Sequence, residues 1–140
     1  MPHRAEMNHF VAYHNTEKMK CPLHFHSDFR FHTNKSQTLL EKSIGACLWI
    51  ITGAYEGKRL KTFRLLAFYT PTEVLPSDRG SLKFQVVGKD GKEFSDPPII
   101  NECEWFPELI KCLGNFRFGI QEINSRGVIS GLTVLEQASS

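Results

Sequence analysis

Aromatic rings are the side chains of this chain best suited to binding chemistry, and they come from segments far apart in the sequence. The 140 residues include 11 Phe, three Tyr and two Trp. Rings from separate elements can form a cage that stacks a flipped base, at about 1–3 kcal/mol per stacked base. The candidate rings are Trp49, Phe68, Tyr69, Trp105, Phe116 and Phe118. This set predicts an aromatic pocket for a planar ligand.

Amide and hydroxyl side chains near these rings are candidates for reading the polar edge of a base. They are Asn15, Asn34, Thr52 and Asn115. The alternative is that the rings simply fill the core of a small, Phe-rich domain. Trp49 and Trp105 are the rings that we expect at a partly open rim, because an indole N–H needs a hydrogen-bond partner.

A second kind of chemistry is metal binding, since the chain has six His and four Cys. Cys21, His24 and His26 lie close together in the sequence, but no second pair follows at the spacing of a zinc site. Cys103 and Cys112 are nine residues apart and do not supply that pair. We therefore predict no metal site and no cofactor.

A catalytic alternative is a small metal-dependent nuclease that uses His9, His14 and His32. Such a site needs a general base and a metal or a phosphate-polarising partner close together in space. The sequence shows neither a constellation of this kind nor a nucleophile or phosphate-loop motif. We expect a domain without catalytic residues.

The charge balance limits what electrostatics alone can contribute. Seventeen Lys and Arg against 15 Asp and Glu give a net charge of +2, whereas strong electrostatic nucleic-acid binders carry a marked basic excess. A local patch would have to contact phosphates, and its candidates are Lys35, Lys58, Arg59 and Lys61. The alternative for the residues 58–61 is the solvated end of a strand.

Length and composition favour one domain over residues 1–140, with residues 1–6 as a disordered leader. We find no apolar run of membrane-spanning length and no secretory signal. Four Cys in this setting are typical of thiols in a reducing compartment, which predicts a cytoplasmic protein.

The pattern of apolar and turn residues predicts an α+β fold with a mixed, partly closed β-barrel of about five to seven strands. Two or three short helices accompany the sheet. Strands are expected at residues 7–13, 29–32, 48–52, 59–69, 82–86, 92–94, 116–123 and 128–135. Helices are expected at residues 36–42 and 107–113, with Asn34 or Ser36 as the candidate cap of the first and Asn101 as that of the second. Residues 88–91 should form a tight hairpin turn, and residues 71–80 a loop.

The order of these elements resembles the PUA-like superfamily and, within it, the EVE-like domains. A strand at Asn8–Tyr13 is followed by a polar turn, a short helix and a buried strand, and the segment Trp105–Phe116 supplies the late helix, Gly turn and strand. The resemblance implies a partly closed barrel that encloses a modified base of a nucleic acid. It also implies a partner, because relatives accompany nucleases in restriction systems.

The resemblance also implies which residues line the site. Tyr13, His14 and Asn15 would form the turn after the first strand. Trp49, Ile51 and Thr52 would wall the pocket, with Trp105 contributed by the late helix. The resulting hypothesis is non-catalytic recognition of DNA or RNA through a modified or flipped base. A protein-interaction module is the third hypothesis, with Trp105, Phe106 and the loop Pro71–Gly80 as its contact surface.

Overall fold

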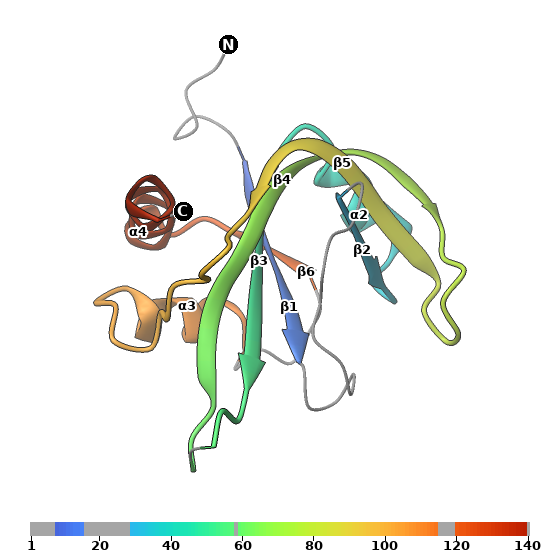
Figure 1. The fold of residues 1–140 in the computed structure, drawn as a ribbon. Helices are drawn as coiled ribbons and strands as arrows, with labels where there is room; N and C mark the ends of the chain where they lie inside the picture. The colour runs from blue at the N-terminus through green and yellow to red at the C-terminus, as the bar shows by residue number, and fades with distance from the viewer. Residues whose placement is uncertain (1–7, 16–28, 58, 115–119, 140) are drawn as a thin grey trace.

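Within the residues that the structure describes, the fold is a curled sheet of six strands accompanied by three helices (Figure 1). The computed structural model describes residues 8–15, 29–57, 59–114 and 120–139. The strands are β1 (His9–Asn15), β2 (Phe29–Thr33), β3 (Cys47–Ala54), β4 (Thr62–Pro76), β5 (Phe84–Glu93) and β6 (Ile120–Ile123). The helices are α2 (Gln37–Lys42), α3 (Phe106–Cys112) and α4 (Arg126–Ala138). The predicted α+β class is confirmed.

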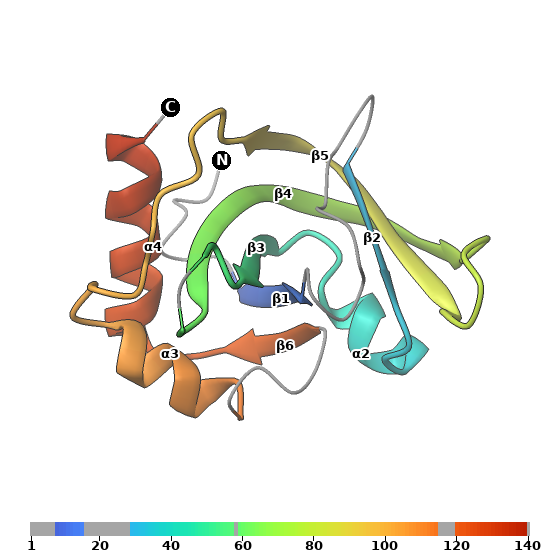
Figure 2. The same ribbon diagram turned by 60° about the horizontal axis from the view of Figure 1, so that its bottom comes forward.

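The sheet has the order β2-β5-β4-β3-β1-β6. β1 runs parallel to β3, and the other neighbours are antiparallel. Figure 2 shows the sheet end-on, with β4 arching over β3 and β1, and with β2 on the side of α2. The sheet is therefore a mixed half-barrel, and among the described residues its edge strands β2 and β6 do not pair with each other.

The curvature comes from two long strands, β4 and β5, which stay paired through two irregularities in register. Gly88 and Gly91 lie where β5 passes closest to β4. A Cβ on Gly88 would collide with the carbonyl oxygen of Thr70, and one on Gly91 with that of Phe68. The predicted hairpin at 88–91 is therefore wrong. These residues lie inside β5, where the two glycines allow β5 to approach β4 closely. The predicted loop from Pro71 is also wrong as far as Pro76, which ends β4.

The sheet is buried on both faces, and each face has its own apolar cluster. The helix face packs against α3 and α4 and contains Val11, Tyr13, Cys47, Trp49, Ile51, Leu65, Phe68, Phe94, Ile100, Phe106, Leu109, Leu113, Ile123, Val128 and Leu132. The barrel face contains Phe10, Ala12, Phe31, Leu40, Ala46, Leu48, Ile50, Leu66, Ala67, Tyr69, Val86 and Ile120. Burial on both faces explains the nearly continuous apolar sequence of β3.

Residues 126–138 form helix α4, so the predicted returning strand at 128–135 is wrong. Ser125 caps the helix, its Oγ accepting from the N–H of Val128 at 3.4 Å. Val128 and Leu132, one helical turn apart, are the residues that α4 buries. The β-branched residues in this segment suggested a strand, but capping and the four-residue apolar spacing favour the helix.

The two predicted helices are confirmed, with one change of cap. The N–H of Leu39 donates to Ser36 Oγ, as expected for the N-cap of α2. Asn101 does not cap α3. Its Oδ1 accepts from the N–H of Phe63, and its Nδ2 donates to the carbonyl of Lys61. Asn101 thus fixes the segment before α3 to the start of β4.

None of the helices within the described ranges is long and apolar enough to cross a membrane. The predicted leader at residues 1–6 lies outside the described residues.

Gly131 and Gly127, both in α4, provide a test of how this helix packs. A Cβ on Gly131 would collide with the indole of Trp105, whereas one on Gly127 meets only Ser125 Oγ at 3.9 Å. Gly131→Ala should lower the free energy of unfolding by about 1–3 kcal/mol through overpacking. Gly127→Ala should raise it by about 0.5 kcal/mol through reduced chain entropy. Urea denaturation of both variants measures the difference, and equal stability would contradict this packing.

Candidate functional site

A row of polar residues crosses the barrel face on three neighbouring strands, β1, β3 and β4. His14 on β1 lies beside Thr52 on β3, and Thr52 lies beside Arg64 on β4. Residues opposite one another in paired strands share a face, and Ala12 and Leu66, two positions from His14 and Arg64, belong to the barrel-face cluster. His14 is buried, while Thr52 and Arg64 are half-buried.

Arg64 cross-links two segments at the end of this row. Its Nε and Nη2 donate to the carboxylate oxygens of Glu56 at 3.0 and 2.9 Å, and its Nη1 donates to the carbonyl of Pro97 at 2.7 Å. The hydrogen bonds that Arg64 donates to Glu56 raise the pKa of Arg64 above its usual value. A bidentate pair of this kind fixes both groups in direction. The guanidinium therefore holds the β3–β4 connection against the segment that follows β5.

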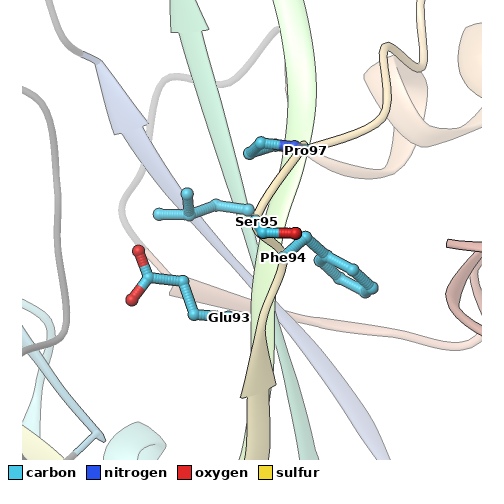
Figure 3. Close-up of a pocket in the computed structure, with 5 residues that line it drawn as sticks. Glu93, Phe94, Ser95 and Pro97 are labelled. Atoms are coloured by element: carbon cyan, nitrogen blue, oxygen red, sulfur yellow. The ribbon is translucent and has the colours of Figure 1, made fainter. Parts of the chain in front are cut away.

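A hollow of about 330 Å³ opens beside that segment, lined by Leu66, Glu93, Phe94, Ser95 and Pro97. Phe94 N–H donates to Leu66 O, and Leu65 N–H donates to Pro98 O. Between these two bonds the chain bends away from β4. Figure 3 shows that Glu93 and Phe94 leave the chain on opposite sides. The volume lies at the lower end of the range typical of small-molecule pockets.

Trp49 lies in the core. Its side chain has no exposed surface, and its Nε1 donates to His9 Nδ1 at 2.9 Å. The rings of Trp49 and His9 are stacked, with their centroids 6.1 Å apart. The ring of Phe68 also packs against Trp49, with the two centroids 5.3 Å apart. The predicted position of Trp49 at an open rim is wrong, because its indole partner is a buried histidine.

Tyr69 and Ile51 are also fully buried. The Tyr69 hydroxyl donates to the carbonyl of Val86 at 2.6 Å, its ring stacks on Phe29, and burial raises its pKa. Ile51 and Trp49 face the helices, whereas Tyr69 belongs to the barrel face. The sheet separates these predicted pocket residues, so they do not surround one cavity in this structure.

Tyr13 and Trp105 lie on the helix side. The Tyr13 ring packs 6.0 Å from that of Phe63, over Gly53. Burial, and next the charge on Tyr55, raise the pKa of Tyr13 to about 12. Trp105 is half-buried against Gly131.

The remaining predicted residues lie on separate connections. Asn34 Oδ1 accepts from the N–H of Lys83 at 2.8 Å. Lys35 follows β2, and partial burial lowers its pKa. Arg59 and Lys61 lie on the β3–β4 connection. Four further predicted residues, Lys58, Asn115, Phe116 and Phe118, are outside the described residues, and Asn15 ends β1.

The histidines proposed for a nuclease do not meet. His9 contacts Trp49, and His14 lies five positions along β1 and therefore faces the opposite side. His32 Nδ1 is hydrogen-bonded to Ser77 Oγ at 2.7 Å, and burial followed by the charge on Arg79 lowers its pKa. Within the described ranges, no three His, Cys, Asp or Glu form a group able to hold a metal ion.

The surface proposed for a protein-interaction module is internal only in part. Phe106 and Pro71 are buried, whereas the other residues between 72 and 80 are half-buried or exposed, and residues 71–76 belong to β4 and not to a loop. Half-buried Trp105 and the part of the loop after Pro76 remain outside these elements.

Sequence analysis did not identify the residues of the hollow or its cross-link. Arg64 was the available signal, because it puts a charge in a strand whose other residues are largely apolar. The Ser-Asp-Pro-Pro run after Phe94 was a second signal, since two prolines end regular strand pairing.

Comparison of the chain with protein-family models, with curated proteins and with solved structures finds no match. The site therefore rests on its own geometry.

The buried contact between Trp49 and His9 can be tested with a double-mutant cycle. His9→Leu removes the acceptor and leaves the indole N–H unsatisfied in the core, which should cost about 1–3 kcal/mol. Trp49→Phe removes the donor. The double variant should lose less stability than the two single losses combined, because no indole donor remains to be satisfied. Denaturant unfolding gives all four stabilities, and strictly additive losses would contradict the contact.

The raised pKa of Tyr13 predicts that the folded protein loses stability at alkaline pH. Its pKa of about 12 in the folded protein lies above the ordinary value of 10, so the unfolded chain loses this proton first as the pH rises. The stabilisation is complete below pH 10 and is lost as the pH rises toward 12. Tyr13→Phe should therefore show a smaller decrease in unfolding midpoint between pH 9 and pH 11 than the unsubstituted protein. An identical decrease in both would contradict the shift.

Proposed function

We propose that this chain is a non-catalytic domain that binds nucleic acid and holds one modified or flipped base in the hollow beside Leu66. The observation that carries the proposal is the hollow itself, which combines apolar walls with a carboxylate and a hydroxyl. A base needs both kinds of surface, because its faces are apolar and its edges form hydrogen bonds.

Four of the lining residues have a role in this proposal. Leu66 and Pro97 supply apolar contact for the faces of the base, whereas the ring of Phe94 is buried in the helix-face cluster. The carboxyl oxygens of Glu93 can accept hydrogen bonds, which suits the exocyclic amino group of cytosine or adenine. Ser95 can donate or accept at a neighbouring edge atom.

Phosphate contacts in this proposal come from Arg59 and Lys61 on the β3–β4 connection. Arg64 does not contact phosphate in this proposal, because its guanidinium donates to Glu56 and to the carbonyl of Pro97. Arg64 instead keeps the β3–β4 connection and the hollow at a fixed separation. With few phosphate contacts, the affinity should fall only gently with salt.

The order of the elements supports assigning the half-barrel to the PUA-like superfamily as an EVE-like domain, which we also propose. On that assignment, a nuclease of a restriction system is the partner that acts on the bound nucleic acid. The thiols of Cys103 and Cys112 are outside any disulfide, which supports a cytoplasmic location.

Glu93→Gln tests the proposal. Replacing one acceptor oxygen with an amide donor should weaken binding of an amino-bearing base about tenfold or more. Fluorescence anisotropy with labelled DNA and RNA, each with modified and unmodified bases and at two salt concentrations, gives the affinities. Glu73→Gln, an exposed change on β4, is the matched control. Equal affinities for Glu93→Gln and Glu73→Gln would rule out the hollow as the base site.

The same oligonucleotides separate binding from catalysis. Incubation with Mg²⁺, Mn²⁺ or Zn²⁺ should leave them intact. Cleavage that disappears in His14→Ala would replace this proposal with a nuclease.

A further inference from the structure

Four rings, here called the ring row, cross the helix face of the sheet from β1 to the end of β5. His9 on β1 is stacked with Trp49 on β3, and the ring of Phe68 on β4 lies 5.3 Å from that of Trp49. Phe94, which follows β5, continues the row, with its centroid 6.3 Å from that of Phe68. Lys92 ends the row, since its Nζ lies 5.0 Å from the centre of the Phe94 ring. The ring row therefore joins a buried histidine to a residue that lines the hollow.

The hydrogen bond at the start of the ring row requires a neutral imidazole. An indole N–H can only donate, so Nδ1 of His9, 2.9 Å from Nε1 of Trp49, is the nitrogen without a proton. An imidazolium carries a proton on both of its nitrogens. Protonated His9 and Trp49 would point two donors at each other in a core where neither side chain is more than 1% exposed. Uptake of a proton by His9 therefore breaks this contact.

The surroundings of His9 on this face are largely apolar. No Asp, Glu, Lys or Arg is buried among the residues that the structure describes. The neighbours that pair with His9 are the buried thiol of Cys47 on β3 and the apolar Ile123 on β6, and Tyr13 is the other titratable group that β1 places on the helix face. The helices that pack on this face carry charged residues that are exposed or half-buried: Glu108 and Lys111 on α3, and Arg126 and Glu136 on α4. A charge on His9 is therefore removed from solvent, which destabilises the protonated form.

We propose that His9 and the ring row form a pH-sensitive switch that controls the shape of the hollow. With neutral His9, the hydrogen bond fixes the indole of Trp49, against which Phe68 and then Phe94 pack. With protonated His9, the indole separates from the imidazole, and the rings beyond it repack. The consequence for binding rests on the proposed function, whereas the change in shape does not.

The hollow responds because Phe94 belongs to both places. Its ring lies in the helix-face cluster, and it leaves the chain on the side opposite Glu93 (Figure 3). A shift of this ring displaces the backbone between Glu93 and Ser95, two of the residues that line the hollow. A base that fits the hollow when His9 is neutral then binds less tightly. By thermodynamic linkage, the bound base in turn opposes the uptake of a proton by His9.

The direction of the pH effect follows from which state of the chain holds the proton. Histidines of an unfolded chain titrate at about pH 6.5, whereas the folded chain favours the neutral form of His9. The stabilisation from the contact with Trp49 is therefore complete above about pH 6.5 and is lost as the pH falls. Burial, followed by the charge on Arg79, lowers the pKa of His32 as well. A variant must therefore separate the two histidines.

His9→Asn tests the switch, because Asn has an acceptor oxygen bonded to Cγ, where His has Nδ1, and does not titrate. NMR spectra of the ¹⁵N-labelled protein at about pH 7.5 and about pH 5.5, on either side of histidine titration, report three signals. They are the indole N–H of Trp49 and the backbone N–H groups of Phe94 and Ser95. All three should move with pH in the unsubstituted protein and move much less in His9→Asn.

His32→Asn is the matched control, because Nδ1 of His32 is also hydrogen-bonded, to Ser77 Oγ. The three signals should move in this variant as they do in the unsubstituted protein. Trp49→Phe is a second test of the contact, since a ring without an N–H leaves no hydrogen bond for protonation of His9 to break. The signals of Phe94 and Ser95 should then respond little to pH.

Binding is measured at the same two pH values, by fluorescence anisotropy with the labelled oligonucleotide that the unsubstituted protein binds most tightly. Acidification should weaken its affinity about tenfold in the unsubstituted protein and less than about twofold in His9→Asn. If acidification weakens binding equally in both proteins, the switch fails and the proposed function stands. If no oligonucleotide binds while all three signals follow His9, the proposed function fails and the switch stands.

The signals themselves decide the remaining outcomes. An indole signal of Trp49 that ignores pH, or that moves equally in His9→Asn, overturns the switch. A response of Trp49 that does not reach Phe94 and Ser95 overturns it too, because the hollow is then independent of His9.

Discussion

Alternation of side chains along β1 and β3 is the constraint on which the arrangement of this molecule depends. Both strands are buried on both faces, so each residue is committed to one of two separate environments. Odd-numbered positions such as Trp49 and Ile51 pack under the helices, and even-numbered positions such as Thr52 face the barrel side. A one-residue slip would exchange these environments along a whole strand. The register between the strands is therefore strongly fixed.

A charged residue, Arg64, organises the start of β4. Arg64 lies in a strand that is otherwise largely apolar, and its guanidinium reaches a carboxylate on one side and a backbone carbonyl on the other. A half-buried charge is stabilised when its hydrogen bonds are satisfied in this way. The result is a stiff link where the chain leaves regular pairing. The hollow lies at that departure, where Leu66 of the barrel-face cluster and Phe94 of the helix-face cluster are among its lining residues.

Local signals in the sequence were sufficient for much of the fold. Ser36 marks the start of α2, and the apolar run around Leu48 marks a strand buried on both faces. Glycines and β-branched residues were misread where tertiary packing decides their role. Gly88 and Gly91 allow two strands to approach closely, but in the sequence such glycines look like a turn. Helix α4 is stabilised by a cap and by two residues buried one turn apart.

The candidate site was harder to predict, although strand parity gave a clue. Tyr13 and His14 are adjacent in a strand and cannot face one cavity, and the same holds for Ile51 and Thr52. The neighbouring positions of His14 and Thr52 follow from the parallel register of β1 and β3, which local sequence does not specify. The contact between Glu56, Arg64 and Pro97 joins residues from three segments. Only the folded chain reveals it.

The position of β1 between β3 and β6 has a consequence for how the protein is made. His9 pairs on one side with Cys47 and on the other with Ile123, near the opposite end of the described chain. During synthesis one edge of β1 thus remains without its strand until residues 120–123 have left the ribosome. Pairings so remote in sequence slow folding, and an uncovered strand edge invites association with other chains. The nascent protein is therefore expected to depend on protection of that edge, by a chaperone or by low concentration, until β6 arrives.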